Sequence, residues 1–102
     1  MSGEEAFRKV IENSQQDLMQ IQAEKMQGCF TRNLDNANGF INCINQITNK
    51  FEKEEKLLTP YVMYSHLKAN YCIEQKRDKK QCWDESSKLI KERMSAFIKS
   101  LD

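Results

Sequence analysis

The chain contains 102 residues, of which 39% are hydrophobic and 30% are charged, so residues 1–102 are expected to form one small domain with a thin core. Sixteen basic and fifteen acidic residues nearly cancel, which argues against a broad nucleic-acid-binding surface. No apolar run approaches the ~20 residues that cross a bilayer, and so small a core often needs a covalent staple or a partner.

The first predicted element is a helix over residues 4–30. Ser2 is a suitable N-cap, and Glu5 follows three residues later as the partner of a capping box. Apolar side chains recur at helical spacings, at Phe7, Ile11, Leu18 and Ile21. The sequence "NLDNANG" at 33–39 then predicts a break, because Asn, Asp and Gly tolerate turn geometry.

A second and a third helical segment are expected after this break. The apolar stripe of the second segment comprises Phe40, Ile44, Ile47, Phe51 and Leu58. The sequence "LLTP" at 57–60 predicts its end or a kink, since Thr59 is a good N-cap and Pro60 a good first helical residue. The third segment is predicted over about 60–76, and Tyr61, Tyr64, Leu67 and Tyr71 are expected to line one face of it.

The last predicted helix covers about residues 81–101. Its apolar positions follow the same three-four spacing, at Trp83, Ile90, Met94, Phe97 and Leu101. No segment alternates as a strand would, and no internal repeat is visible. The fold class is therefore predicted to be all-α, with three to four helices in elongated antiparallel hairpins.

Four cysteines, an even number, are typical of a disulfide framework: Cys29, Cys43, Cys72 and Cys82. Disulfides persist only in oxidising compartments, and the opening "MSGEEAFRKV" lacks the apolar stretch of a secretory signal. This combination indicates the mitochondrial intermembrane space, peripheral to the inner membrane. The alternative is a cytosolic helical adaptor with reduced thiols.

Two disulfide pairings are open. The nested pairing joins Cys29 to Cys82 and Cys43 to Cys72 across two antiparallel helices. On straight helices the first two cysteines would lie ~21 Å apart and the last two ~15 Å. A disulfide tolerates a Cα separation of only ~4.4–6.8 Å, so the two bridges of the nested pairing fit straight helices poorly. The local pairing, 29 with 43 and 72 with 82, is favoured because each pair flanks a turn-forming stretch, whereas the nested one requires the break at 33–39 to be only a kink.

Two parts of the chain resemble families of intermembrane-space proteins. The sequence "GCFTRNLDNANGFINCINQITNKF" resembles the small Tim chaperones, whose helices converge on paired CxxxC motifs. Cys29 matches the first cysteine of the first motif and Cys43 the last cysteine of the second, while Asn33 and Gly39 stand at the inner positions. The sequence "YCIEQKRDKKQCWDESSKLI" resembles the inner turn of a coiled-coil-helix-coiled-coil-helix (CHCH) protein, where a helix, a short charged loop and a helix are bridged.

The resemblance implies a non-catalytic role. We expect a structural accessory subunit on the intermembrane-space side of an inner-membrane complex of the respiratory chain, where it would stabilise assembly against larger protein subunits. The alternative is a small Tim-like chaperone that holds hydrophobic precursors. The resemblance also implies that Leu67 and Tyr71, close to Cys72, belong to an import signal.

Four aromatic residues are the candidate partner-binding residues: Tyr61, Tyr64, Tyr71 and Trp83. Tyrosine and tryptophan are the usual anchors where an apolar stripe meets a protein partner. The basic cluster formed by Lys76, Arg77, Lys79 and Lys80 is expected to be a solvated loop, and the alternative is contact with acidic lipid head groups or an acidic neighbour.

No pattern in the sequence indicates catalysis. The chain has no CxxC motif and only one histidine, His66, so neither a zinc site nor an exchange-active dithiol is expected. No Ser-His-Asp set or glycine-rich phosphate loop is present. We therefore expect no enzyme activity, no metal, no cofactor, no small-molecule substrate and no nucleic acid.

Overall fold

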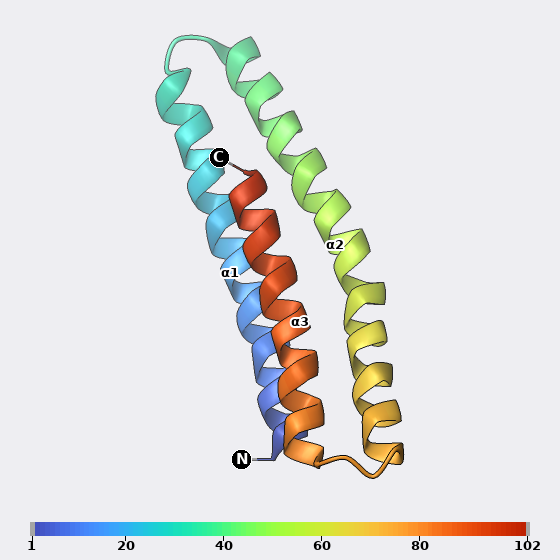
Figure 1. Cartoon of the computed structure of the whole chain (residues 1–102). Coiled ribbons are helices and arrows are strands. Elements are labelled where there is room, and N and C mark those ends of the chain that lie inside the picture. Colours follow the sequence, from blue (N-terminus) through green and yellow to red (C-terminus); the bar gives the residue numbers. More distant parts are fainter. Residues whose placement is uncertain (1, 102) are drawn as a thin grey trace.

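The computed structural model describes residues 2–101, which form three α-helices and contain no strand. The helices are α1 (Gly3–Arg32), α2 (Ala37–Glu74) and α3 (Lys79–Ser100). The chain runs along α1, returns along α2 and turns again into α3, so consecutive helices are antiparallel (Figure 1). The molecule measures 61 × 22 × 16 Å, and the predicted elongated all-α fold is confirmed.

Side chains at the start of each helix accept hydrogen bonds from backbone N–H groups that have no partner inside the helix. Ser2 Oγ accepts from the N–H of Glu5 at 3.2 Å, as the sequence predicts. Asn36 Oδ1 accepts from the N–H of Gly39 at 3.0 Å, within the predicted break. The cap of α3 is Asp78, three residues before the predicted start of the last helix.

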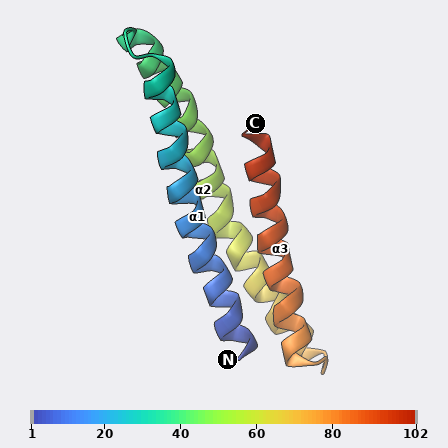
Figure 2. The same cartoon turned by 90° about the vertical axis from the view of Figure 1, so that its left-hand side faces the viewer.

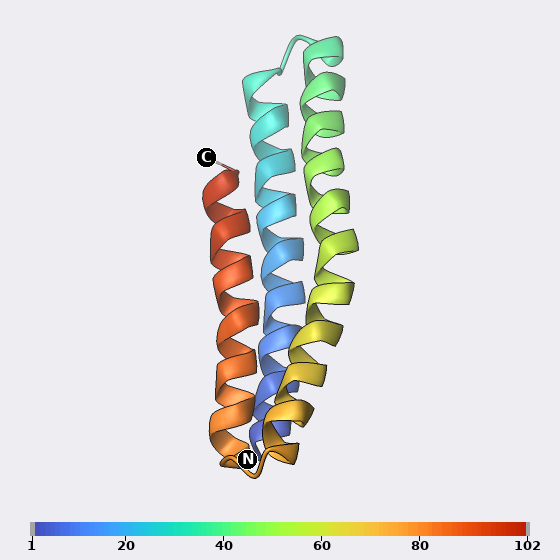
Figure 3. The ribbon, with the colours of Figure 1, turned by 45° about the vertical axis from the view of Figure 1, so that its right-hand side comes forward.

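The predicted end of a helix at Thr59 and Pro60 was wrong, because α2 continues through both residues to Glu74. A proline inside a helix removes one backbone hydrogen bond and crowds the preceding turn. Pro60 is exposed, so water can satisfy the carbonyl that lost its donor. Leu58 before it and Ser65 after it are buried against the other helices, which holds the two halves in line. Figure 3 shows α2 as one unbroken helix with a gentle curve.

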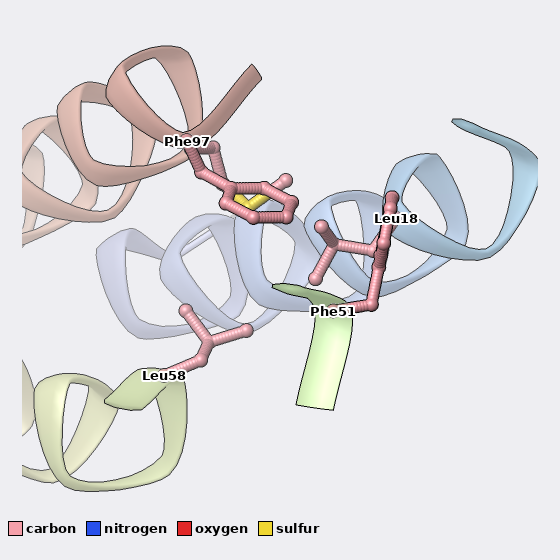
Figure 4. Packing of buried hydrophobic residues seen from close by; sticks show 5 residues of the cluster. Leu18, Phe51, Leu58 and Phe97 are labelled. Carbon is pink, nitrogen blue, oxygen red and sulfur yellow. The ribbon is translucent and has the colours of Figure 1, made fainter. Parts of the chain in front are cut away.

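The core consists of two clusters along the molecule, and each takes side chains from all three helices. One cluster comprises Leu18, Phe51, Leu58, Met94 and Phe97 (Figure 4). The other comprises Phe7, Ala69, Trp83 and Ile90. α3 therefore packs against both α1 and α2, and it ends well before their connection (Figures 1 and 2). The far end of the molecule is built from α1 and α2 alone.

One ion pair links α2 to α3 inside this thin core. The guanidinium of Arg93 donates to both carboxylate oxygens of Glu54, at 2.9 and 2.6 Å. The side chain of Glu54 is only 3% exposed, so Arg93 replaces the water contacts that the carboxylate loses on burial. The hydrogen bonds from Arg93 to Glu54, together with the carboxylate charge, raise the pKa of Arg93 above its ordinary value.

We predict that Arg93→Met lowers the free energy of unfolding by about 3 kcal/mol, because it leaves a buried carboxylate without a partner. Replacing both partners, with Glu54→Leu and Arg93→Met, is expected to restore most of this loss. Lys88→Met is the control, since Lys88 pairs with Glu92 at an exposed position and is expected to change stability by less than about 0.5 kcal/mol. Urea denaturation followed by circular dichroism measures all three; a double variant as unstable as Arg93→Met would contradict the prediction.

Candidate protein-interaction surface

Two disulfides join the helices, and their pairing is the local one. Cys29 and Cys43 are bonded with a Cα separation of 5.6 Å, and Cys72 and Cys82 with a separation of 5.8 Å. The nested pairing is therefore wrong. The nested pairing required the break at 33–39 to be only a kink in one continuous helix. Instead, α1 ends at Arg32 and α2 runs back beside it.

The two bridges hold opposite ends of α2. Cys43 lies near its first turns and Cys72 near its last, ~44 Å apart at 1.5 Å per residue. The first bridge ties α2 to α1 at the end of the molecule that α3 does not reach, and the second ties α2 to α3. α2 is thus the central rod of the structure, fixed at both ends.

The hairpin of α2 and α3 is compatible with a CHCH-like hairpin. Arg77, in the loop between these helices, donates to Glu85 in α3 at 2.8 Å. Lys76 adopts the left-handed backbone conformation, with φ of 63°, which reverses the chain directly after α2. The basic cluster of Lys76, Arg77, Lys79 and Lys80 is exposed at this end of the molecule.

The four aromatic residues predicted to bind a partner do not form one surface. Trp83 is only 6% exposed and packs on Phe7, with ring centroids 5.4 Å apart, so it belongs to the core. Tyr61 is half-buried against the same cluster. Tyr64 and Tyr71 are 54% and 64% exposed, and they point away from the core on α2.

An exposed apolar line on α2 includes these two tyrosines. It consists of Leu57, Pro60, Tyr64, Leu67 and Tyr71, which alternate at spacings of three and four residues. We call it the outer seam. All five positions are exposed, while the buried stripe of α2, which includes Phe51, Leu58 and Ala69, lies on another side of the helix.

The sequence predicted one face of Tyr61, Tyr64, Leu67 and Tyr71, of which Tyr61 packs against the core instead, and it missed that Leu57 extends the line of the other three. The reason is the false break at Pro60, which divided the seam between two predicted segments. The available signal was the helical periodicity on both sides of Pro60, which places Leu57 seven residues before Tyr64.

A second apolar feature lies between α1 and α2. It is a groove of about 460 Å³, whose apolar lining comprises Ile11, Leu18, Met19, Leu58 and Val62. Gln15, Glu55 and Thr59 contribute its polar edge. Phe30, Leu34 and Ile41 are also exposed, at the end that α3 does not reach.

Within residues 2–101, no group of three or more histidine, cysteine or acidic residues is arranged to hold a metal ion. None of the helices in this range combines the length and the apolar character needed to cross a bilayer. Comparison of the chain with protein-family models, with curated proteins and with solved structures finds no match. The fold and the exposed surfaces therefore define the protein only as a disulfide-pinned three-helix protein.

We predict that Tyr64→Ala and Tyr71→Ala each change the free energy of unfolding by less than about 1 kcal/mol, because both side chains are exposed. Trp83→Ala is expected to cost about 3–5 kcal/mol, because it opens a cavity against Phe7. Urea denaturation of the oxidised protein measures the difference. A tyrosine variant as unstable as the tryptophan variant would show that the outer seam is part of the core.

Proposed function

We propose that this protein is a non-catalytic structural subunit that binds larger protein subunits through the outer seam of α2. The observation that carries the proposal is the exposure of an ordered apolar line on a helix fixed by disulfides at both ends. Aligned tyrosine and leucine side chains that the fold leaves in water are typical of a surface that a partner covers. Because the helix is rigid, binding requires little further ordering.

We place this role on the intermembrane-space side of a mitochondrial inner-membrane complex, most specifically a respiratory-chain complex. Two structural disulfides need an oxidising compartment to form and persist. The resemblance of residues 71–90 to the inner turn of CHCH proteins, and of residues 28–51 to small Tim chaperones, supports the intermembrane space as that compartment. The protein would stabilise assembly by shape, without contributing reactive groups.

The second candidate function is a small Tim-like chaperone for hydrophobic precursors in the same compartment. The groove between α1 and α2 favours it, since its apolar lining offers a binding site of low specificity. Met19 on its rim supports adaptable contacts, because methionine is flexible and polarisable.

The test is the location and assembly of the full chain in the cells that express it, carrying a C-terminal tag. We expect the tag to resist protease in intact mitochondria and to be degraded after the outer membrane is ruptured. On blue-native electrophoresis the protein should migrate with one inner-membrane complex, and its depletion should lower the amount of that complex.

Two results would contradict this function. A soluble oligomer that binds precursors during their import, and leaves every inner-membrane complex intact when depleted, would favour the chaperone. A cytosolic protein whose four thiols react with alkylating reagent in freshly quenched cells would exclude both candidates. Degradation of the tagged protein could imitate either result. Its abundance is therefore measured in the same samples.

A further inference from the structure

We propose that the outer seam binds an acidic amphipathic helix of the partner, which lies along α2 as in a two-stranded coiled coil. This inference rests on the proposed function and specifies the chemistry of the partner at the same surface. It follows from the spacing of the seam, from its width and from the charges beside it.

The spacing of the seam matches a helix as its partner. From Leu57 to Tyr71 the apolar residues alternate at intervals of three and four, the repeat that lets two helices interlock side chains over many turns. The line is ~21 Å long at 1.5 Å per residue, about four helical turns. Leu67, between Tyr64 and Tyr71, is 59% exposed, so the side chains needed for such packing are free of contacts that would bury them.

The seam is also narrow. A strict three-four line is the width of a coiled-coil contact, whereas a helix that lies in a membrane interface carries a broader apolar face. The other apolar side of α2 is used in the core by Phe51, Leu58 and Ala69, so only Met63, which is 61% exposed, adds apolar surface beside the seam. These features favour a protein helix over a lipid surface.

Basic residues flank the seam. Lys53 and Lys56 each precede a seam residue by one turn, Lys50 lies one turn further back, and Lys68 follows Tyr64 by four residues. The ammonium of Lys68 lies 5.8 Å from the centre of the Tyr64 ring. None of the four lysines has an ion pair among residues 2–101 in the structure.

Two nearby carboxylates are bound by arginine side chains, whereas Glu52 and Glu55 of α2 are exposed, and Glu55 lines the groove between α1 and α2. Glu54, on the side of α2 toward α3, is bound by Arg93, and Glu85 of α3 is bound by Arg77. Glu74, at the end of α2, is the acidic residue that follows the seam. The four lysines thus outnumber the exposed Glu52 and Glu74 beside the seam, which leaves an excess of positive charge. Glutamate or aspartate at the flanking positions of a partner helix would complement it.

This charge excess also disfavours a second copy of the chain. In a symmetric pair through the outer seam, the same lysine-rich surface would come from both molecules, and like charges across an interface are unfavourable. The partner helix is therefore expected to come from another protein and to carry the opposite charge.

The first test measures peptide binding to the oxidised full-length protein. Two synthetic 21-residue helices carry leucine at the same three-four positions, and their flanking positions are all glutamate in one and all lysine in the other. In ¹⁵N NMR titrations, the glutamate peptide is expected to shift amide signals of residues 53–71 and to bind at least tenfold more tightly than the lysine peptide.

Matched variants locate the site. Tyr64→Ser with Tyr71→Ser, and separately Lys53→Glu with Lys68→Glu, are expected to weaken binding of the glutamate peptide at least tenfold. Ile41→Ser is the control, because Ile41 lies on the same helix with a similar exposure, 52%, but outside the seam. Equal binding of both peptides, shifts confined to the groove between α1 and α2, or equal loss in the Ile41 variant would overturn the proposal.

The second test identifies the natural occupant. Benzoylphenylalanine replaces Leu67 in the cellular protein, with Ile41 as the control position, and the cross-linked peptide is sequenced by mass spectrometry after irradiation. We expect position 67 to capture a segment with apolar residues at three-four spacing and a net negative charge. A cross-link to the same chain, to lipid alone, or to a basic or non-helical segment would overturn the proposal.

Failure of this inference is distinguishable from failure of the proposed function. If the Tyr64 and Tyr71 double variant still migrates with the inner-membrane complex on blue-native electrophoresis, the function stands and the seam does not bind the partner. If the unmodified chain joins no complex, the function fails, while the peptide titration still reports whether the seam accepts an acidic helix.

Discussion

The disulfides at the two ends of α2 are the constraint on which the rest of this structure depends. Past the end of α3, α1 and α2 form a two-helix hairpin, where each helix has only one neighbour to pack against. Phe30 and Phe40 meet edge to face there, with ring centroids 6.2 Å apart, and the Cys29–Cys43 bond closes the loop beside them. Closing a loop of this length contributes roughly 3 kcal/mol, against a total stability of about 5–15 kcal/mol for a typical domain. The covalent bonds thus supply what a thin core of three helices lacks.

Much of this arrangement follows from local sequence. The three-four spacing of apolar residues, the Asn-rich break at 33–39 and the position of each cysteine beside a turn predict the helices and the local disulfide pairing. The effect of Pro60 could not be read in this way, because a proline ends a helix or is tolerated according to which side of the helix it faces. That side is decided by tertiary packing, here by Leu58 and Ser65 on either side of an exposed proline.

Burial of polar and aromatic side chains was the other part that the sequence did not reveal. Glu54 looks like any glutamate in the charged stretch 52–56, and only its contact with Arg93, 39 residues later, marks it as buried. Trp83 is aromatic like the three tyrosines, and the sequence does not show which of them is buried. In the structure Trp83 packs on Phe7, while Tyr64 and Tyr71 face outward. The candidate surface was therefore predicted in part, as two tyrosines and a leucine, and its full length appeared only when α2 proved to be continuous.

A rod fixed at both ends is well suited to present a straight line of side chains to a partner. The core side of α2 aligns the helix against α1 and α3, and the outer seam uses the remaining side without disturbing that packing. In the proposed function, the protein acts through its shape, which the two disulfides fix.

Digestion with trypsin tests the disulfides directly, since its cleavage sites place the four cysteines in four separate peptides, 26–32, 33–50, 69–76 and 81–88. Mass spectrometry of the non-reduced digest, prepared from alkylated native protein, should find 26–32 joined to 33–50 and 69–76 joined to 81–88. Alkylated free cysteines, or 26–32 joined to 81–88, would contradict the account.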